Sequence, residues 1–95
     1  MSRLYYTEPS QDIFDEVKSV AIEIWREYDN TYGYADEKVD EIKDMENIKD
    51  NLMYIVAMFD QDNQQKLADK LSDESRKAIR DRMIDGGNEE WLICF

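Results

Sequence analysis

Acidic side chains recur at helical spacing in the first half of this 95-residue chain. Residues four apart lie on one face of a helix, so such a row holds its carboxylates side by side. Carboxylates in rows could do acid–base catalysis, bind a cation or imitate a polyanion. The candidate residues are Asp12, Glu16, Glu23 and Glu27 in one segment, and Asp36, Glu37, Asp40, Glu41 and Asp44 in the next.

The remaining composition argues against an enzyme. The chain has no histidine, which is the commonest general base and metal ligand. Cys94 lies in a bulky apolar stretch, where a thiol is expected to pack as an inert hydrophobe. Because the chain has 23 Asp and Glu residues, two neighbouring carboxylates alone do not identify an acid–base pair. We therefore predict that the protein is not an enzyme and needs no cofactor.

Neither a metal loop nor a membrane span is expected. The best calcium-loop candidate begins at Asp60, but its sixth position is Gln65 instead of Gly and its twelfth is Leu71 instead of Glu. The longest apolar run covers residues 52–59, whereas a membrane helix needs about 20 apolar residues. A single cysteine excludes an internal disulfide framework. These features predict a cytoplasmic protein without a metal site.

The acidic rows carry an energetic penalty that folding does not require. On a helix the four acids of the first segment form a stripe about 60° wide and about 22 Å long. The two segments contain five like-charge pairs at a spacing of four residues, and each pair costs about 0.2–0.5 kcal/mol. Lys38 and Lys43 offset part of this repulsion. The rows either serve a function or form a solvated face that aids solubility.

The functional interpretation is mimicry of a phosphate backbone. Duplex DNA carries one charge per about 1.7 Å of axis, so about 22 Å holds about 13 phosphates. Residues 8–62 contain 16 acids and 5 bases, which is a comparable density. We predict that the nine candidate carboxylates occupy the DNA-binding surface of a basic protein and that the chain does not bind nucleic acid itself. Binding should then weaken steeply with salt.

A second interpretation rests on aromatic residues. Tyr28, Tyr32 and Tyr34 border the acidic rows, either as anchors of an interface or as core and loop packing. In this alternative the chain is a small helical adaptor, regulatory or immunity-type protein that binds through apolar and tyrosine contacts, and the acids only aid solubility. A basic run could pair with acids of the same chain or of a second copy; it consists of Arg76, Lys77, Arg80 and Arg82.

The elements that must hold these residues are mainly helices, in one compact acidic domain over 1–95. Apolar spacing predicts a helix over 10–29 with Ser10 as N-cap, and a turn over 29–34 in which Gly33 can take a positive φ. A second helix is predicted over 36–59, with Asp36 as its cap and a kink or restart at Asn47.

The last third of the sequence predicts shorter elements. A short helix is expected around residues 67–71 after a break or cap at 60–63, and another from Ser72 to the stop at Gly86. The terminal segments 3–6 and 91–95 are rich in bulky apolar residues and could pair as a short two-stranded sheet. The predicted fold is therefore mainly α, with three to four helices and the option of this sheet.

In size, charge and aromatic-rich acidic helices, the chain resembles the small acidic DNA-mimic proteins of bacteriophages, of the anti-restriction type. Two short stretches of its sequence are similar to sequences of such proteins; they are Ile48-Lys49-Asp50-Asn51 and Leu71-Ser72-Asp73-Glu74. The resemblance implies a homodimer in the host cytoplasm. It also implies that the carboxylates block a host restriction nuclease or nucleoid protein and so counteract host defence or regulation. DNA mimics share no motif, so no residue assignment is carried over. The nearly neutral stretch 63–85 restricts any match to one face.

Overall fold

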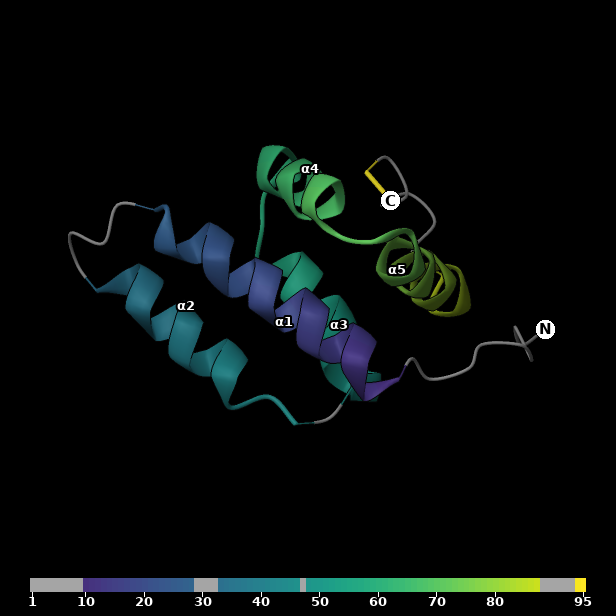
Figure 1. The fold of residues 1–95 in the computed structure, drawn as a ribbon, viewed down its shortest axis with the longest axis horizontal. Coiled ribbons are helices and arrows are strands. Elements are labelled where there is room, and N and C mark those ends of the chain that lie inside the picture. Colours follow the sequence, from purple (N-terminus) through teal and green to yellow (C-terminus); the bar gives the residue numbers. More distant parts are fainter. Residues whose placement is uncertain (1–9, 29–32, 47, 88–93) are drawn as a thin grey trace.

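The computed structural model describes residues 10–28, 33–46, 48–87 and 94–95, and this part contains five α-helices (Figure 1). The prediction of three to four helices is therefore wrong. No strand occurs in the described ranges, and the segments predicted to pair as a terminal sheet lie outside them except for residues 94–95. The helices are α1 (Gln11–Arg26), α2 (Tyr34–Lys43), α3 (Ile48–Ala57), α4 (Gln61–Lys70) and α5 (Asp73–Asp85).

Helix α1 is the central element of the fold. It contacts each of the other four helices, with α2 running back along one side, α3 behind it, and α4 and α5 on the side away from α2 (Figure 1). Its residues Phe14, Val17, Ala21 and Ile24 are fully buried. The predicted apolar face of this helix is therefore the centre of the core.

The start of α1 is confirmed, and its end comes earlier than predicted. The Ser10 hydroxyl oxygen accepts a hydrogen bond from the Ile13 amide at 3.4 Å, and the helix ends at Arg26. The positive φ predicted for Gly33 is observed at 72°. Gly33 itself is the N-cap of α2, so the prediction that Asp36 caps this helix is wrong. Asp36 lies instead in the first turn, where a carboxylate is favourable beside the helix dipole.

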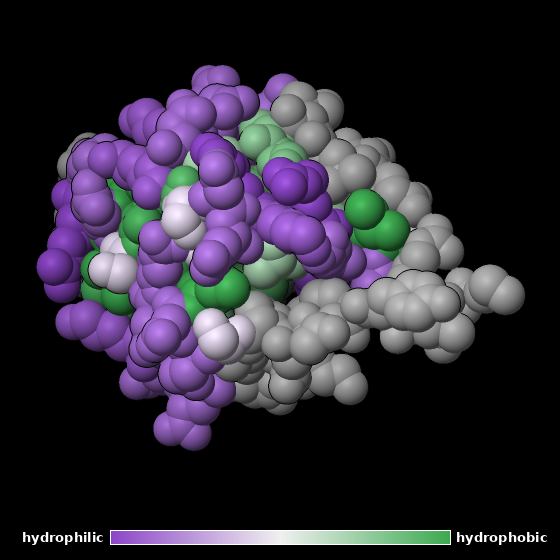
Figure 2. Space-filling view, turned by 45° about the vertical axis from the view of Figure 1, so that its right-hand side comes forward, coloured by the Kyte–Doolittle hydropathy of each residue, from purple (hydrophilic) through white to green (hydrophobic). Residues whose placement is uncertain are grey.

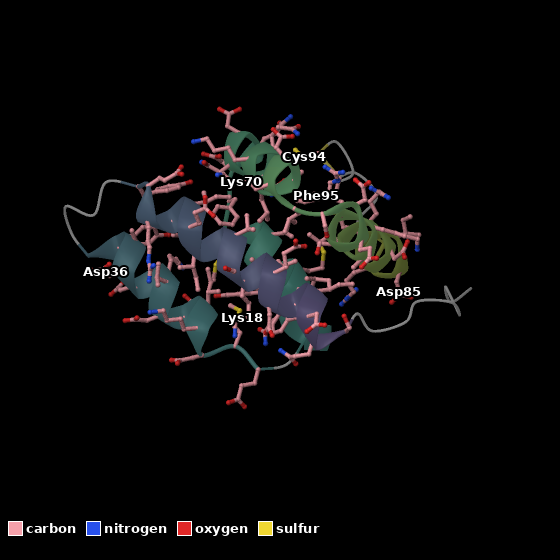
Figure 3. All side chains as sticks on the ribbon, viewed as in Figure 1. Lys18, Asp36, Lys70, Asp85, Cys94 and Phe95 are labelled. Carbon is pink, nitrogen blue, oxygen red and sulfur yellow. The ribbon has the colours of Figure 1, made fainter. Side chains whose placement is uncertain are left out.

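The restart predicted near Asn47 is confirmed, because α2 ends at Lys43 and α3 begins at Ile48, whereas the alternative of one continuous helix over 36–59 is wrong. The apolar residues of the two halves point in different directions on a single helix, so one straight helix could not bury both sets. The break is stabilised from α1, since the Lys18 ammonium donates to the carbonyls of Lys43 at 3.4 Å and Met45 at 2.8 Å. Figure 3 shows Lys18 on the side of α1 that faces this end of α2. Asn47 lies outside the described residues.

Helix α5 begins at the predicted cap Ser72, whereas α4 already begins after Asp60, within the predicted break or cap, and is longer than the short helix expected around residues 67–71. The Asp60 carboxylate accepts from the Asn63 amide at 2.9 Å, and the Ser72 hydroxyl oxygen accepts from the Ser75 amide at 3.2 Å. Helix α5 ends at Asp85, with the predicted stop residue Gly86 as its C-cap. Phe95 is buried beside α4 and α5 (Figure 3), and its carbonyl accepts from Arg80 at 2.5 Å.

Within the described ranges, none of the helices is long and apolar enough to cross a membrane.

Candidate protein-binding surface

Three acids of α2 and the acid that caps its C-terminal end form a continuous exposed surface. At 3.6 residues per turn they fall within about 100° of arc, on the side opposite the buried residues Val39 and Ile42. The structure places their side chains in solvent, and Asp36 is seen on the outer side of α2 in Figure 3. We call this surface the outward acidic face of α2; its members are Asp36, Glu37, Asp40 and Asp44.

Two of the acids predicted in α1 bind partners in other parts of the chain. The Glu16 carboxylate accepts hydrogen bonds from the hydroxyls of Ser72, at 2.8 Å, and of Ser75. These bonds to Ser75 and Ser72 lower the pKa of Glu16, although burial opposes the shift. Glu23 forms an ion pair with Lys70 at 2.9 Å. Glu16 and Glu23 therefore connect α1 to the second half of the chain.

The other two acids of the α1 stripe are exposed at its ends. Asp12 lies in the first turn of α1, and Glu27 follows its last turn. The hydrogen bond and charge of Glu23 raise the pKa of Lys70, and the charge of Glu27 adds a smaller effect in the same direction. The stripe is thus partly neutralised by α4, which the spacing of acids within one helix could not reveal.

A groove that contains two cations separates the acids of α1 from the outward acidic face of α2. It has a volume of about 410 Å³ and is lined by Ser19, Ile22, Glu23, Arg26 and Lys43. Arg26 and Lys43 are both exposed. The nine predicted carboxylates therefore do not share one surface.

The ninth predicted acid, Glu41, belongs to a cluster with aromatic residues. Its carboxylate accepts from the Tyr54 hydroxyl at 2.5 Å and from the Lys38 ammonium at 3.4 Å. The Tyr54 bond is the largest effect on Glu41 and lowers its pKa, while the same bond raises the pKa of Tyr54. The Lys38 ammonium also lies 5.3 Å from the centre of the Tyr34 ring. Sequence spacing missed this cluster because Tyr54 comes from α3.

Tyr34 and Tyr54 line a second, smaller groove between α2 and α3. This tyrosine groove has a volume of about 230 Å³ and is formed by Tyr34, Lys38, Tyr54, Ala57 and Met58. The two tyrosines are the exposed large hydrophobic residues of the described ranges. The coloured part of the face drawn in Figure 2 is mostly hydrophilic, and hydrophobic residues appear there in separate areas.

The predicted tyrosine anchors have different environments. Tyr28 is half-buried and packs on Trp25 with ring centres 4.4 Å apart, whereas Tyr34 is 54% exposed. Burial, followed by the charges of Asp60 and Tyr34, raises the pKa of Tyr28. Tyr32 lies outside the described residues. Of the two described tyrosines, Tyr34 is the more exposed.

The basic run of α5 pairs largely within the chain. Arg76 contacts the Asp73 carboxylate and donates to the Ala68 carbonyl, and Lys77 pairs with Asp81 at 2.7 Å. Arg80 holds the carbonyl of Phe95. These contacts favour the intramolecular alternative for the run.

The outward acidic face of α2 has the charge spacing of a single nucleic-acid strand. Its four acids span nine residues, from Asp36 to Asp44, which is about 12 Å along the helix axis. One strand of DNA carries a phosphate every 3.4 Å, so about 12 Å holds about three to four phosphates. The charge density of duplex DNA was matched in the sequence by counting all acids of residues 8–62. The fold distributes the described acids of this range over several surfaces, so the outward acidic face alone matches a single strand.

Comparison of the chain with protein-family models, curated proteins and solved structures found no match.

Proposed function

We propose that this protein binds the positively charged, DNA-binding surface of another protein through the outward acidic face of α2. The supporting observation is that four carboxylates lie exposed along one side of a helix at the spacing of a phosphate strand. The core of the domain lies on the opposite side of α2, which presents the acids on a preorganised helix. Preorganisation reduces the entropy lost on binding.

The proposal assigns different roles to the nine predicted carboxylates. The outward face supplies the phosphate surrogates, and Asp12 and Glu27 extend the negative field at the two ends of α1. Glu16, Glu23 and Glu41 act mainly within the fold, because each accepts a hydrogen bond from a side chain of another helix or loop.

Affinity capture tests this function directly. The protein is immobilised, exposed to a bacterial lysate at low salt and eluted with a salt gradient; captured partners are then challenged with single-stranded and duplex DNA. We expect DNA to displace the protein, because both compete for the same cations. If neither form of DNA displaces it, the mimicry proposal is wrong.

A charge-reversal variant with a matched control locates the surface. The variant Glu37→Lys, Asp40→Lys and Asp44→Lys reverses three acids of the outward face. The control Asp62→Lys, Asp69→Lys and Asp85→Lys reverses three exposed acids at similar positions of α4 and α5. For the first variant we expect the slope of log affinity against log salt to fall by about 2 to 3, and for the control little change. Equal losses would place the site elsewhere.

The adaptor function remains a second candidate, favoured by the exposure of Tyr34 and Tyr54 on one groove. Salt distinguishes the two functions. An interface dominated by apolar contacts should persist in about 0.5 M salt, where the Debye length is only a few ångströms, whereas a charge-driven complex should dissociate.

A further inference from the structure

The tyrosine groove combines exposed aromatic rings with a carboxylate. Tyr34 is 54% exposed and Tyr54 47% exposed, although both are large side chains. The groove volume of about 230 Å³ is below the roughly 300–1,000 Å³ of small-molecule sites. Its size therefore suits a single side chain of a protein partner better than a metabolite.

Both rings are held in place before any partner arrives. Tyr34 packs edge-on against Trp25, with ring centres 5.7 Å apart, and Trp25 stacks on Phe59 at 5.3 Å. The Tyr54 hydroxyl is fixed by its hydrogen bond to Glu41 at 2.5 Å. Rings that are already ordered lose little entropy on binding, which is typical of interface hot spots.

The groove already binds a cation of its own chain. The Lys38 ammonium lies 5.3 Å from the centre of the Tyr34 ring and 3.4 Å from the Glu41 carboxylate. Ring and carboxylate together therefore form an environment that accepts a positive charge. Lys38 is a flexible side chain that can leave this place when a competing cation enters.

We propose that the tyrosine groove receives an arginine side chain of the basic partner, which displaces Lys38 and stacks on the tyrosine rings beside Glu41. Arginine suits this place better than lysine because its planar guanidinium stacks on aromatic faces, binds carboxylates through two parallel donors and is more weakly hydrated. The neighbouring outward acidic face of α2 attracts the basic segment that carries it. This inference rests on the proposed function and names the residue type that the partner must present.

The test uses two synthetic peptides of equal length and net charge, one whose cations are all arginine and one whose cations are all lysine. Binding to the full chain is measured by NMR titration. We expect the arginine peptide to bind about two- to fivefold more tightly and to shift the amide signals of Tyr34, Tyr54 and Met58. Equal affinities for the two peptides would overturn the proposal, as would the absence of any binding.

Variants of the groove residues should either abolish the arginine preference, keep it or raise the affinity for the arginine peptide. Misfolding would only reduce binding, so it cannot explain this set of results. Tyr54→Ala should abolish the preference for arginine, whereas Tyr54→Phe should keep it, because the ring remains although the bond to Glu41 is lost. Lys38→Gln should raise the affinity for the arginine peptide more than Lys43→Gln does, since both variants remove one charge but only Lys38 lines the groove. Equal effects of the two lysine variants would contradict displacement of Lys38.

The charge-reversal variant of the outward face separates this inference from the proposed function. Charge reversal should weaken the binding of both peptides and leave the preference for the arginine peptide unchanged. If reversal weakens neither peptide but the preference for arginine persists, the charge-based function is wrong and the groove assignment stands. If reversal weakens both but no preference exists in the unmodified protein, the function stands and the groove assignment is wrong.

Discussion

Glu16 connects two distant parts of the chain through a single carboxylate. It projects from α1 and accepts hydrogen bonds from the hydroxyls of Ser72 and Ser75 at the beginning of α5. Ser75 is fully buried, so its hydroxyl depends on a partner inside the protein. A negative charge beside the first turn of a helix is also favoured by the helix dipole. Glu16 therefore stabilises the docking of α5 on α1.

The variant Glu16→Gln should lower the free energy of unfolding by about 1–2 kcal/mol at neutral pH, because a charged acceptor is replaced by a neutral one. The hydrogen bonds lower the folded-state pKa of Glu16 below its ordinary value of 4.5. The stabilisation is therefore complete above that value and is lost as pH falls through the folded-state pKa. Urea denaturation across pH measures this; the difference between variant and parent should shrink at acidic pH.

Two controls belong to this prediction. Glu46→Gln changes an exposed carboxylate between α2 and α3 and should have little effect on stability. A double-mutant cycle with Ser75→Ala should show a coupling energy of about 0.5–3 kcal/mol between residues 16 and 75. A coupling energy of zero would show that the two side chains act independently.

At the scale of the elements, Lys18 determines how α2 ends. Its ammonium binds the carbonyl of Lys43, the last residue of α2, which a helix end leaves without an internal partner, and the carbonyl of Met45 in the turn that follows. A cation at a helix C-terminus also complements the dipole. One side chain of α1 thus stabilises both the end of α2 and the turn that leads to α3.

Lys18→Met should keep the apolar stem of the side chain and remove the capping bonds. We expect a loss of about 1 kcal/mol in unfolding free energy, with faster hydrogen exchange at the amides of Asp44 and Met45, which close the last turn of α2. Lys43→Met is the matched control, since that exposed side chain caps nothing in the described ranges. Unchanged exchange in the Lys18 variant would show that α2 ends independently of α1.

At the scale of the whole molecule, the net charge of −11 opposes compaction. The ion pairs described are solvent-accessible contacts such as that between Lys70 and Glu23, and exposed pairs contribute little to stability. Repulsion among the many unpaired acids should therefore dominate the response to salt. The homodimer implied by the resemblance stays a prediction, and sedimentation equilibrium would measure it.

Unfolding free energy should rise when salt increases from about 0.01 to about 0.15 M, because screening reduces the repulsion. Urea midpoints at constant pH provide the measurement. The variant Glu37→Lys, Asp40→Lys and Asp44→Lys is less negative, so its stability should depend less on salt. A decrease of stability with salt in the parent chain would mean that ion pairs outweigh repulsion.

The sequence alone determined most of the local structure. Ser10, Asp60 and Ser72 are confirmed as N-caps and Gly33 as a residue with positive φ, because caps and turns depend on side chains only a few residues away. The apolar period of α1 likewise identified its buried face. These features are set by chemistry within one or two turns of helix.

Tertiary structure decided which carboxylates have a partner within the chain. Glu16 and Glu23 belong to the same wheel stripe as Asp12 and Glu27, yet their partners come from residues about 50 positions away in sequence, in the second half of the chain. Spacing within a helix places side chains on one face, but it does not reveal which neighbouring element covers that face. The tyrosine groove likewise combines Tyr34 and Lys38 of α2 with Tyr54 and Ala57 of α3, so the spacing of residues within one helix could not reveal it.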